Sequence, residues 1–121
     1  MKIFILAFLS IAISVAAQFC LKAGMSSEPV KQLLAQPLGP MTLVNVFLNR
    51  YVFAGFFLYG LGAAVWLSVL AKWDVSKAYP MVGIGFVLSL CVGYLLGEDV
   101  TLQRAIGVML ICAGVYVVAR S

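Results

Sequence analysis

Four polar residues recur at intervals of four along the first apolar stretch of the chain: Ser10, Ser14, Gln18 and Lys22. In a helix, residues four apart lie on the same face, so these side chains form one stripe. Hydrocarbon penalises such groups unless each finds a hydrogen-bonding partner. The stripe is therefore predicted to face other helices or a wet cavity, where an ammonium group can bind a phosphate or a carboxylate.

The members of this stripe differ in how strongly they indicate a function. Ser10 and Ser14 can bond back to their own helix, so neither needs a further role. Gln18 has two donors and an acceptor to satisfy, which favours a position in a cavity wall. Lys22 lies near the end of its apolar run. Snorkelling to the headgroups and binding an anion both remain open for it.

The residue types missing from the chain argue against several chemistries. The 121 residues include eight basic and four acidic side chains and no histidine. Hydrolase triads and zinc sites therefore lack their commonest member. We expect a protein that is not an enzyme, with no metal and no cofactor. The basic residues are scattered singly near segment ends, whereas nucleic-acid binding requires a basic face, so no nucleic-acid partner is expected.

Membrane-spanning helices must position the stripe, because the chain is too apolar for a soluble fold. The hydrophobic residues make up 64% of it, more than a small soluble domain can bury. Uncharged runs of about 20 residues are long enough to cross the hydrocarbon core as helices. We predict an all-α polytopic membrane protein, a single membrane domain over residues 1–121 with mostly short loops. Its four transmembrane helices are expected at residues 3–22, 51–71, 77–97 and 102–119.

The first connection is longer than the other two and has a different composition. It contains several Ser, Pro and Gly residues, followed by a mostly apolar stretch at residues 41–48. Two interpretations remain open for residues 28–48. They contain a short helix lying in the membrane interface, or the second span begins early and is tilted.

The acidic residues and cysteines receive structural interpretations. Glu98 and Asp99 follow the third span and are predicted to lie in a solvated turn. No acidic residue lies inside any predicted span, so no carboxylate is evident there to carry a coupling proton. The cysteines, Cys20, Cys91 and Cys112, lie within spans as small hydrophobic residues, with no disulfide and no metal expected.

Glycines on the fourth helix predict a partner subunit. Gly107 and Gly114 are seven apart and share a helix face, where glycine allows close approach in lipid. Many transporters build a substrate path from two related halves, and four helices supply one half. We expect a dimer through this face, with itself or with a similar small four-helix subunit.

The termini and the link at residues 72–77 are predicted to lie on one side of the membrane. Four basic residues lie on that side and four on the other, so the distribution of positive charge leaves the orientation open.

Two sets of motifs carry a resemblance to known transporter families. Residues 107–115 resemble the last helix of small multidrug resistance transporters, four-helix members of the drug/metabolite transporter superfamily that work as antiparallel dimers. In that family a membrane-embedded glutamate lies two turns before a lysine and binds protons and cationic drugs. Here Ser14 stands eight residues before Lys22, so the residue that defines proton-coupled drug export is absent.

A closer resemblance covers most of the chain. Residues 14–22, 58–60, 65–67 and 77–81 are similar to the small subunits of the bacterial aminoarabinose flippase. The resemblance implies a multi-pass protein of the bacterial inner membrane. It also implies a cargo, undecaprenyl-phosphate-linked 4-amino-4-deoxy-L-arabinose, which that flippase carries for lipid A modification.

The leading hypothesis is a flippase subunit that translocates a polyprenyl-phosphate-linked sugar without a covalent reaction. Its expected partners are the lipid-linked sugar phosphate and membrane lipid. In this hypothesis two basic residues hold the phosphate and the polar stripe passes the sugar. The predicted substrate-binding residues are Ser14, Gln18, Lys22, Arg50, Trp66 and Tyr79. The alternative is a proton-coupled exporter of the small multidrug resistance type.

Overall fold

The computed structural model describes residues 2–121, which form helices and turns with no strand among them. Four helical segments are long and apolar enough to span a membrane. They are α1 (Lys2–Met25), α4 (Arg50–Leu70), a third segment at Val75–Leu95, and α7 (Leu102–Arg120). The predicted all-α class with four transmembrane helices is therefore confirmed.

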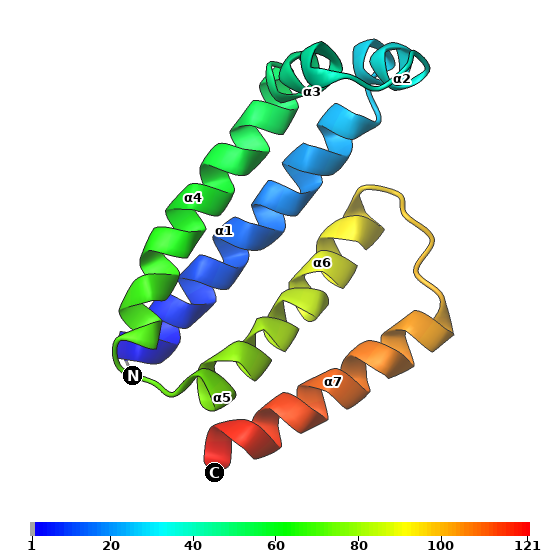
Figure 1. The fold of residues 1–121 in the computed structure, drawn as a ribbon. Coiled ribbons are helices and arrows are strands. Elements are labelled where there is room, and N and C mark those ends of the chain that lie inside the picture. The colour runs from blue at the N-terminus through cyan, green and yellow to red at the C-terminus, as the bar shows by residue number, and fades with distance from the viewer. Residues whose placement is uncertain (1) are drawn as a thin grey trace.

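Helix α1 lies between α4 and the third segment, and α7 lies on the outer side of that segment (Figure 1). Both termini and the link between α4 and the third segment lie at one end of the molecule (Figure 1). The short helices of the first loop and the loop before α7 lie toward the other end (Figure 1). This arrangement follows from four consecutive crossings joined by turns.

The third segment is not one continuous α-helix. It consists of α5 (Val75–Ala78), the 3₁₀ helix η1 (Tyr79–Gly83) and α6 (Ile84–Leu95). Pro80 has no N–H for the carbonyl four residues earlier, and its ring crowds that carbonyl. The sequence predicts one helix over residues 77–97. The structure replaces its first turns with a tighter 3₁₀ helix and ends it at Leu95.

The long first loop holds two short helices, α2 (Glu28–Leu34) and α3 (Pro40–Phe47). Each has proline in its first two positions, where the missing N–H costs no helical bond. Helix α4 has its own cap, because the Asn49 side chain accepts hydrogen bonds from the N–H of Tyr51 (3.0 Å) and Val52 (3.3 Å). The interpretation of an early, tilted second span is therefore wrong. A position of α2 and α3 in the membrane interface stays a prediction.

Two glycines allow α1 and α4 to pack closely. A Cβ placed on Gly55 would lie 2.7 Å from the Cδ2 of Leu21. A Cβ placed on Gly62 would lie 3.1 Å from the Oγ of Ser14. Both glycines are buried, and their spacing of seven puts them on one face of α4. The α1–α4 pair is therefore held by backbone approach, the usual basis of helix association in lipid.

Ser10 joins the same two helices by a hydrogen bond. Its hydroxyl donates to the carbonyl oxygen of Gly62 at 2.7 Å, and its side chain is only 3% exposed. From the sequence alone, a bond back to its own helix is the simpler interpretation of this serine. The structure corrects that interpretation, because the close approach at Gly62 brings a carbonyl of α4 within reach of the hydroxyl.

We expect Ser10→Ala to lower the free energy of unfolding by about 0.5–1.5 kcal/mol, the usual value of an interhelical hydrogen bond in a membrane protein. Reversible unfolding in mixed detergent micelles measures this change. Ser68→Ala is the matched control, because Ser68 is an exposed serine of α4. Equal losses in the two variants would contradict a specific contribution from the Ser10 bond.

Candidate functional site

A cavity of about 770 Å³ lies between α1, α4 and the third segment, and the loop after α6 contributes one residue to it. Ligand sites in proteins commonly measure about 300–1,000 Å³. The lining combines a few polar groups with aliphatic and aromatic side chains. The lining residues are Ser10, Ile11, Ser14, Val15, Gln18, Phe19, Lys22, Tyr59, Gly62, Ala63, Trp66, Val82, Gly85, Phe86, Ser89 and Glu98.

Four of the six predicted binding residues line this cavity. Ser14, Gln18 and Lys22 come from one face of α1, and Trp66 comes from α4. The polar stripe faces the cavity because burying it in hydrocarbon would leave its hydrogen-bonding groups without partners. That these side chains bind a substrate remains a prediction.

Arg50 and Tyr79 lie outside the lining. The Arg50 guanidinium lies 4.9 Å from the ring centroid of Tyr51 and donates a hydrogen bond to its hydroxyl at 3.3 Å. Tyr79 begins η1 directly after α5, the short helix at the end of the molecule that holds the termini (Figure 1), and it is 69% exposed. The cavity therefore gives no support to a binding role for these two residues.

Tyr59 is a cavity residue that the sequence analysis did not predict. The Gln18 amide nitrogen donates a hydrogen bond to the Tyr59 hydroxyl, which orients the amide in the cavity wall. The amide keeps capacity for hydroxyl groups of a ligand, because this bond uses one of its two N–H donors. The helical spacing of Tyr59, Gly62 and Trp66 was a usable signal, since positions three and seven apart share a face.

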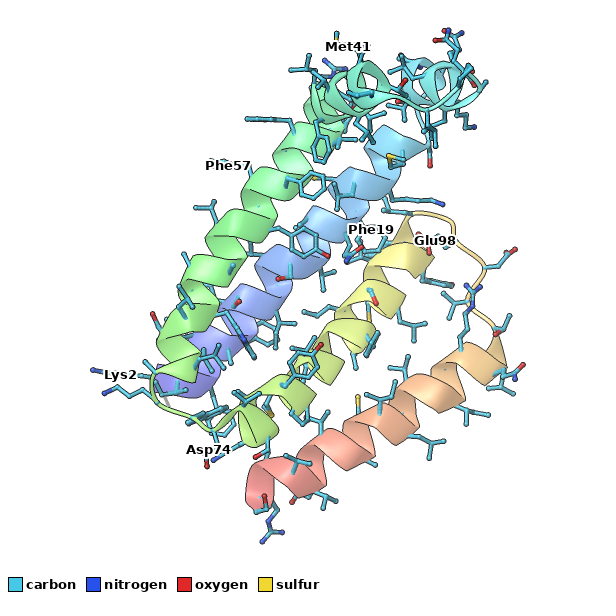
Figure 2. All side chains as sticks on the ribbon, viewed as in Figure 1. Lys2, Phe19, Met41, Phe57, Asp74 and Glu98 are labelled. Atoms are coloured by element: carbon cyan, nitrogen blue, oxygen red, sulfur yellow. The ribbon has the colours of Figure 1, made fainter. Side chains whose placement is uncertain are left out.

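Glu98 is the charged member of the cavity wall that the sequence did not predict. It is solvent-exposed, as expected of the turn after the third span, yet it lines the cavity together with Phe19 of α1. Figure 2 shows these two residues near each other at one end of the space between α1 and α6. The prediction of a solvated turn is therefore incomplete for Glu98, because its side chain also forms part of the cavity wall.

The backbone at the end of α6 accounts for the position of Glu98. The N–H of Glu98 donates to the carbonyl of Gly93 at 2.9 Å, and the N–H of Gly97 donates to the carbonyl of Tyr94 at 3.1 Å. These two bonds form a Schellman motif, which requires a residue with positive φ. Gly97 supplies it with a φ of 89°.

The charged groups of the cavity lie at one of its ends. Lys22 lies in the last turn of α1, and Glu98 follows the last turn of α6. Helices α1 and α6 run in the same direction, because one crossing, α4, lies between them in the sequence. An ammonium and a carboxylate therefore lie toward the same side of the membrane, above a lining of hydroxyl, amide and indole groups.

A second, smaller cavity of about 330 Å³ adjoins the first, since Ile11 lines both. All of its lining residues are apolar: Phe4, Ile5, Ala7, Phe8, Ile11, Met81 and Ile84. They come from the first turns of α1 and from the η1–α6 region. Such a surface suits a hydrocarbon chain, which gains free energy when it leaves water and needs no polar partner.

Comparisons with curated proteins found related flippase subunits. The chain is 31% identical over 108 residues to a probable 4-amino-4-deoxy-L-arabinose-phosphoundecaprenol flippase subunit ArnF of Proteus mirabilis, a match that covers 86% of this chain and 81% of that protein. It is 30% identical over 82 residues to a probable ArnE subunit of Pseudomonas fluorescens, which covers 67% and 72% of the two chains.

A higher identity extends over a shorter stretch. A probable ArnE subunit of Pseudomonas savastanoi is 48% identical over 62 residues, covering 50% of this chain and 54% of that protein. The chain thus spans about half the length of this relative and of the ArnE subunit of Pseudomonas syringae. No known family profile matches the chain. No solved structure matches it.

Four helices long and apolar enough to span a membrane, three of which line a cavity with polar and charged walls, define a small polytopic membrane protein. The relatives narrow that class. The chain belongs to the family of the 4-amino-4-deoxy-L-arabinose-phosphoundecaprenol flippase subunits ArnE and ArnF. It is a multi-pass protein of the bacterial inner membrane. The resemblance to this family that the sequence motifs carry is confirmed.

Proposed function

We propose that the chain is a flippase subunit that moves a polyprenyl-phosphate-linked sugar across the bacterial inner membrane. The proposed cargo is undecaprenyl-phosphate-linked 4-amino-4-deoxy-L-arabinose, the substrate for which its relatives are named. One observation carries the proposal: Lys22 and the polar stripe of α1 line a cavity between membrane-spanning helices. The chain is not an enzyme in this proposal, because the headgroup changes sides with all its bonds intact.

The cavity suggests how each part of the cargo is accommodated. The Lys22 ammonium binds the phosphate as a compact point charge. The Ser14 hydroxyl and the Gln18 amide exchange hydrogen bonds with sugar hydroxyls, replacing the water that the sugar loses. Trp66 offers an apolar ring surface, as aromatic side chains do in many ligand sites. The prenyl chain occupies the apolar cavity at Ile11 and the surrounding lipid.

We further propose that a second small four-helix subunit packs against α7. This helix has a single buried residue, Val115, and its outward side chains include Met109, Leu110 and Tyr116. Apart from the neighbouring residues and backbone of α7 itself, no described atom lies within 4 Å of a Cβ placed on Gly107 or Gly114. Both glycines therefore leave room for the close backbone approach that joins helices in lipid. The partner is a second copy or a related chain, and either supplies the other wall of the path.

Inverted membrane vesicles test the proposed function, because they retain any partner subunit. Vesicles from cells that make the protein should translocate added lipid-linked aminoarabinose, measured as its protection from a membrane-impermeant amine reagent. Vesicles from a deletion strain should translocate it at the background rate. Export of a cationic dye driven by a pH gradient, without movement of the lipid, would contradict this proposal and support the proton-coupled exporter.

A further inference from the structure

We propose that Glu98 selects a cargo whose sugar carries an amine, by pairing its carboxylate with the ammonium group. This inference rests on the proposed function and assigns the charged groups of the headgroup to the two charged residues of the cavity. Lys22 binds the phosphate, and Glu98 binds the protonated amine at the same end of the cavity. Glu98 is thereby a specificity-determining residue, with no part in any covalent step.

The fold holds Glu98 in a defined position and does not leave it on a free loop. The Schellman motif turns the chain back over the end of α6, with Gly97 in a conformation that other residues rarely adopt. The side chain then lies against Gly93, where a Cβ would come within 3.0 Å of the carboxylate Oε1. Gly93 is buried although it has no side chain of its own, because Glu98 covers it.

The charges of the cavity also favour a cargo that carries an amine. Lys22 and Glu98 are the charged residues of the cavity lining. A carboxylate in the wall of a phosphate site repels the phosphate, so it weakens binding of a headgroup that carries only negative charge. A headgroup with both a phosphate and an ammonium group satisfies both residues. Such a pairing favours the correct ligand and penalises the wrong one, as specific sites commonly do.

A competing role for Glu98 is to pair with Lys22 and order the cavity. This role predicts that loss of the carboxylate changes transport of every cargo by the same factor. Selection for an amine predicts a change only for the cargo that carries one. The ratio of the two transport rates therefore separates the two roles.

The experiment compares wild-type protein with Glu98→Gln in vesicles that retain the partner subunit. The probes are radiolabelled undecaprenyl-phosphate-linked 4-amino-4-deoxy-L-arabinose and the same lipid with a 4-formamido group, which is uncharged. Susceptibility of the sugar to a membrane-impermeant oxidant of vicinal diols reports translocation of both. We expect the wild type to favour the amine about tenfold, the usual size of one charged hydrogen bond, and Glu98→Gln to lower that ratio to about one.

Asp99→Asn is the matched control, because Asp99 is the next acidic residue and does not line the cavity. It should keep the wild-type ratio. An equal slowing of both probes by Glu98→Gln, or an unchanged ratio, would overturn the role of Glu98 in selection. If the wild type moves both probes at equal rates, selection by Glu98 is overturned and the proposed function stands. A wild type that moves neither probe overturns the proposed function as well.

Discussion

Lys22→Ala is expected to reduce translocation of the lipid-linked aminoarabinose by at least about tenfold, while the protein still inserts and folds. Lys22 is exposed in the last turn of α1 and contributes no buried packing, so its removal should leave the helices in place. The loss in rate follows from the missing ammonium group, since a hydrogen bond to a charged group contributes about 1.5–3 kcal/mol. The vesicle assay measures the rate, and quantitative immunoblotting measures insertion.

Lys31→Ala is the control for this prediction. Lys31 is an exposed lysine in α2, toward the same end of the molecule, and it does not line the cavity. Its replacement removes the same charge from the same side and should leave the rate within about twofold of wild type. A wild-type rate for Lys22→Ala would remove Lys22 from the site. Equal losses in both variants would indicate attraction of the anionic lipid by surface charge, without a specific phosphate site.

Gly55→Leu is expected to disrupt the α1–α4 pair and to lower the free energy of unfolding by about 3 kcal/mol or more. Even the first added carbon would lie 2.7 Å from two carbons of Leu21 and 3.1 Å from a backbone carbonyl of α1. The helices must therefore separate to accommodate the side chain. Separation would also open the cavity between them, so translocation should fall together with stability.

Gly60→Leu provides the comparison on the same helix. Apart from the neighbouring residues and backbone of α4 itself, a Cβ on Gly60 meets no described atom within 4 Å, so a side chain there does not press against α1. Unfolding in mixed micelles should show little loss for Gly60→Leu. Similar losses in the two variants would show that α4 disfavours leucine in general, and would contradict close packing at Gly55. The Ser10→Ala variant tests the same helix pair through its hydrogen bond, with a smaller expected effect.

The cavity also bears on the choice between a flippase and a proton-coupled exporter. Ser14 occupies the position where the drug exporters carry glutamate, and it lines the cavity. A hydroxyl cannot bind and release a proton near neutral pH, so this wall supplies no coupling group of that kind. Glu98 is a carboxylate of the cavity, but it lies in the exposed turn after the span, where a charge is solvated.

Local properties of the sequence determined the number of spans and the stripe of polar residues. Hydropathy over about 20 residues identifies a membrane-spanning helix, because the thickness of the bilayer sets its length. A spacing of four places Ser14, Gln18 and Lys22 on one face of one helix, whatever that helix packs against. The same spacing indicated a polar cavity, because hydrocarbon does not tolerate an unpartnered stripe.

Only the tertiary structure decided which other residues join that stripe. Tyr59 and Glu98 reach the cavity through contacts between segments far apart in the sequence, and Arg50 and Tyr79 remain outside it. Hydropathy does not specify which helix faces meet, since in lipid that choice depends on shape and close approach at residues such as Gly55 and Gly62. The turn at Gly97 then places the Glu98 carboxylate, which lies outside the spans, in the wall of the cavity that the spans form.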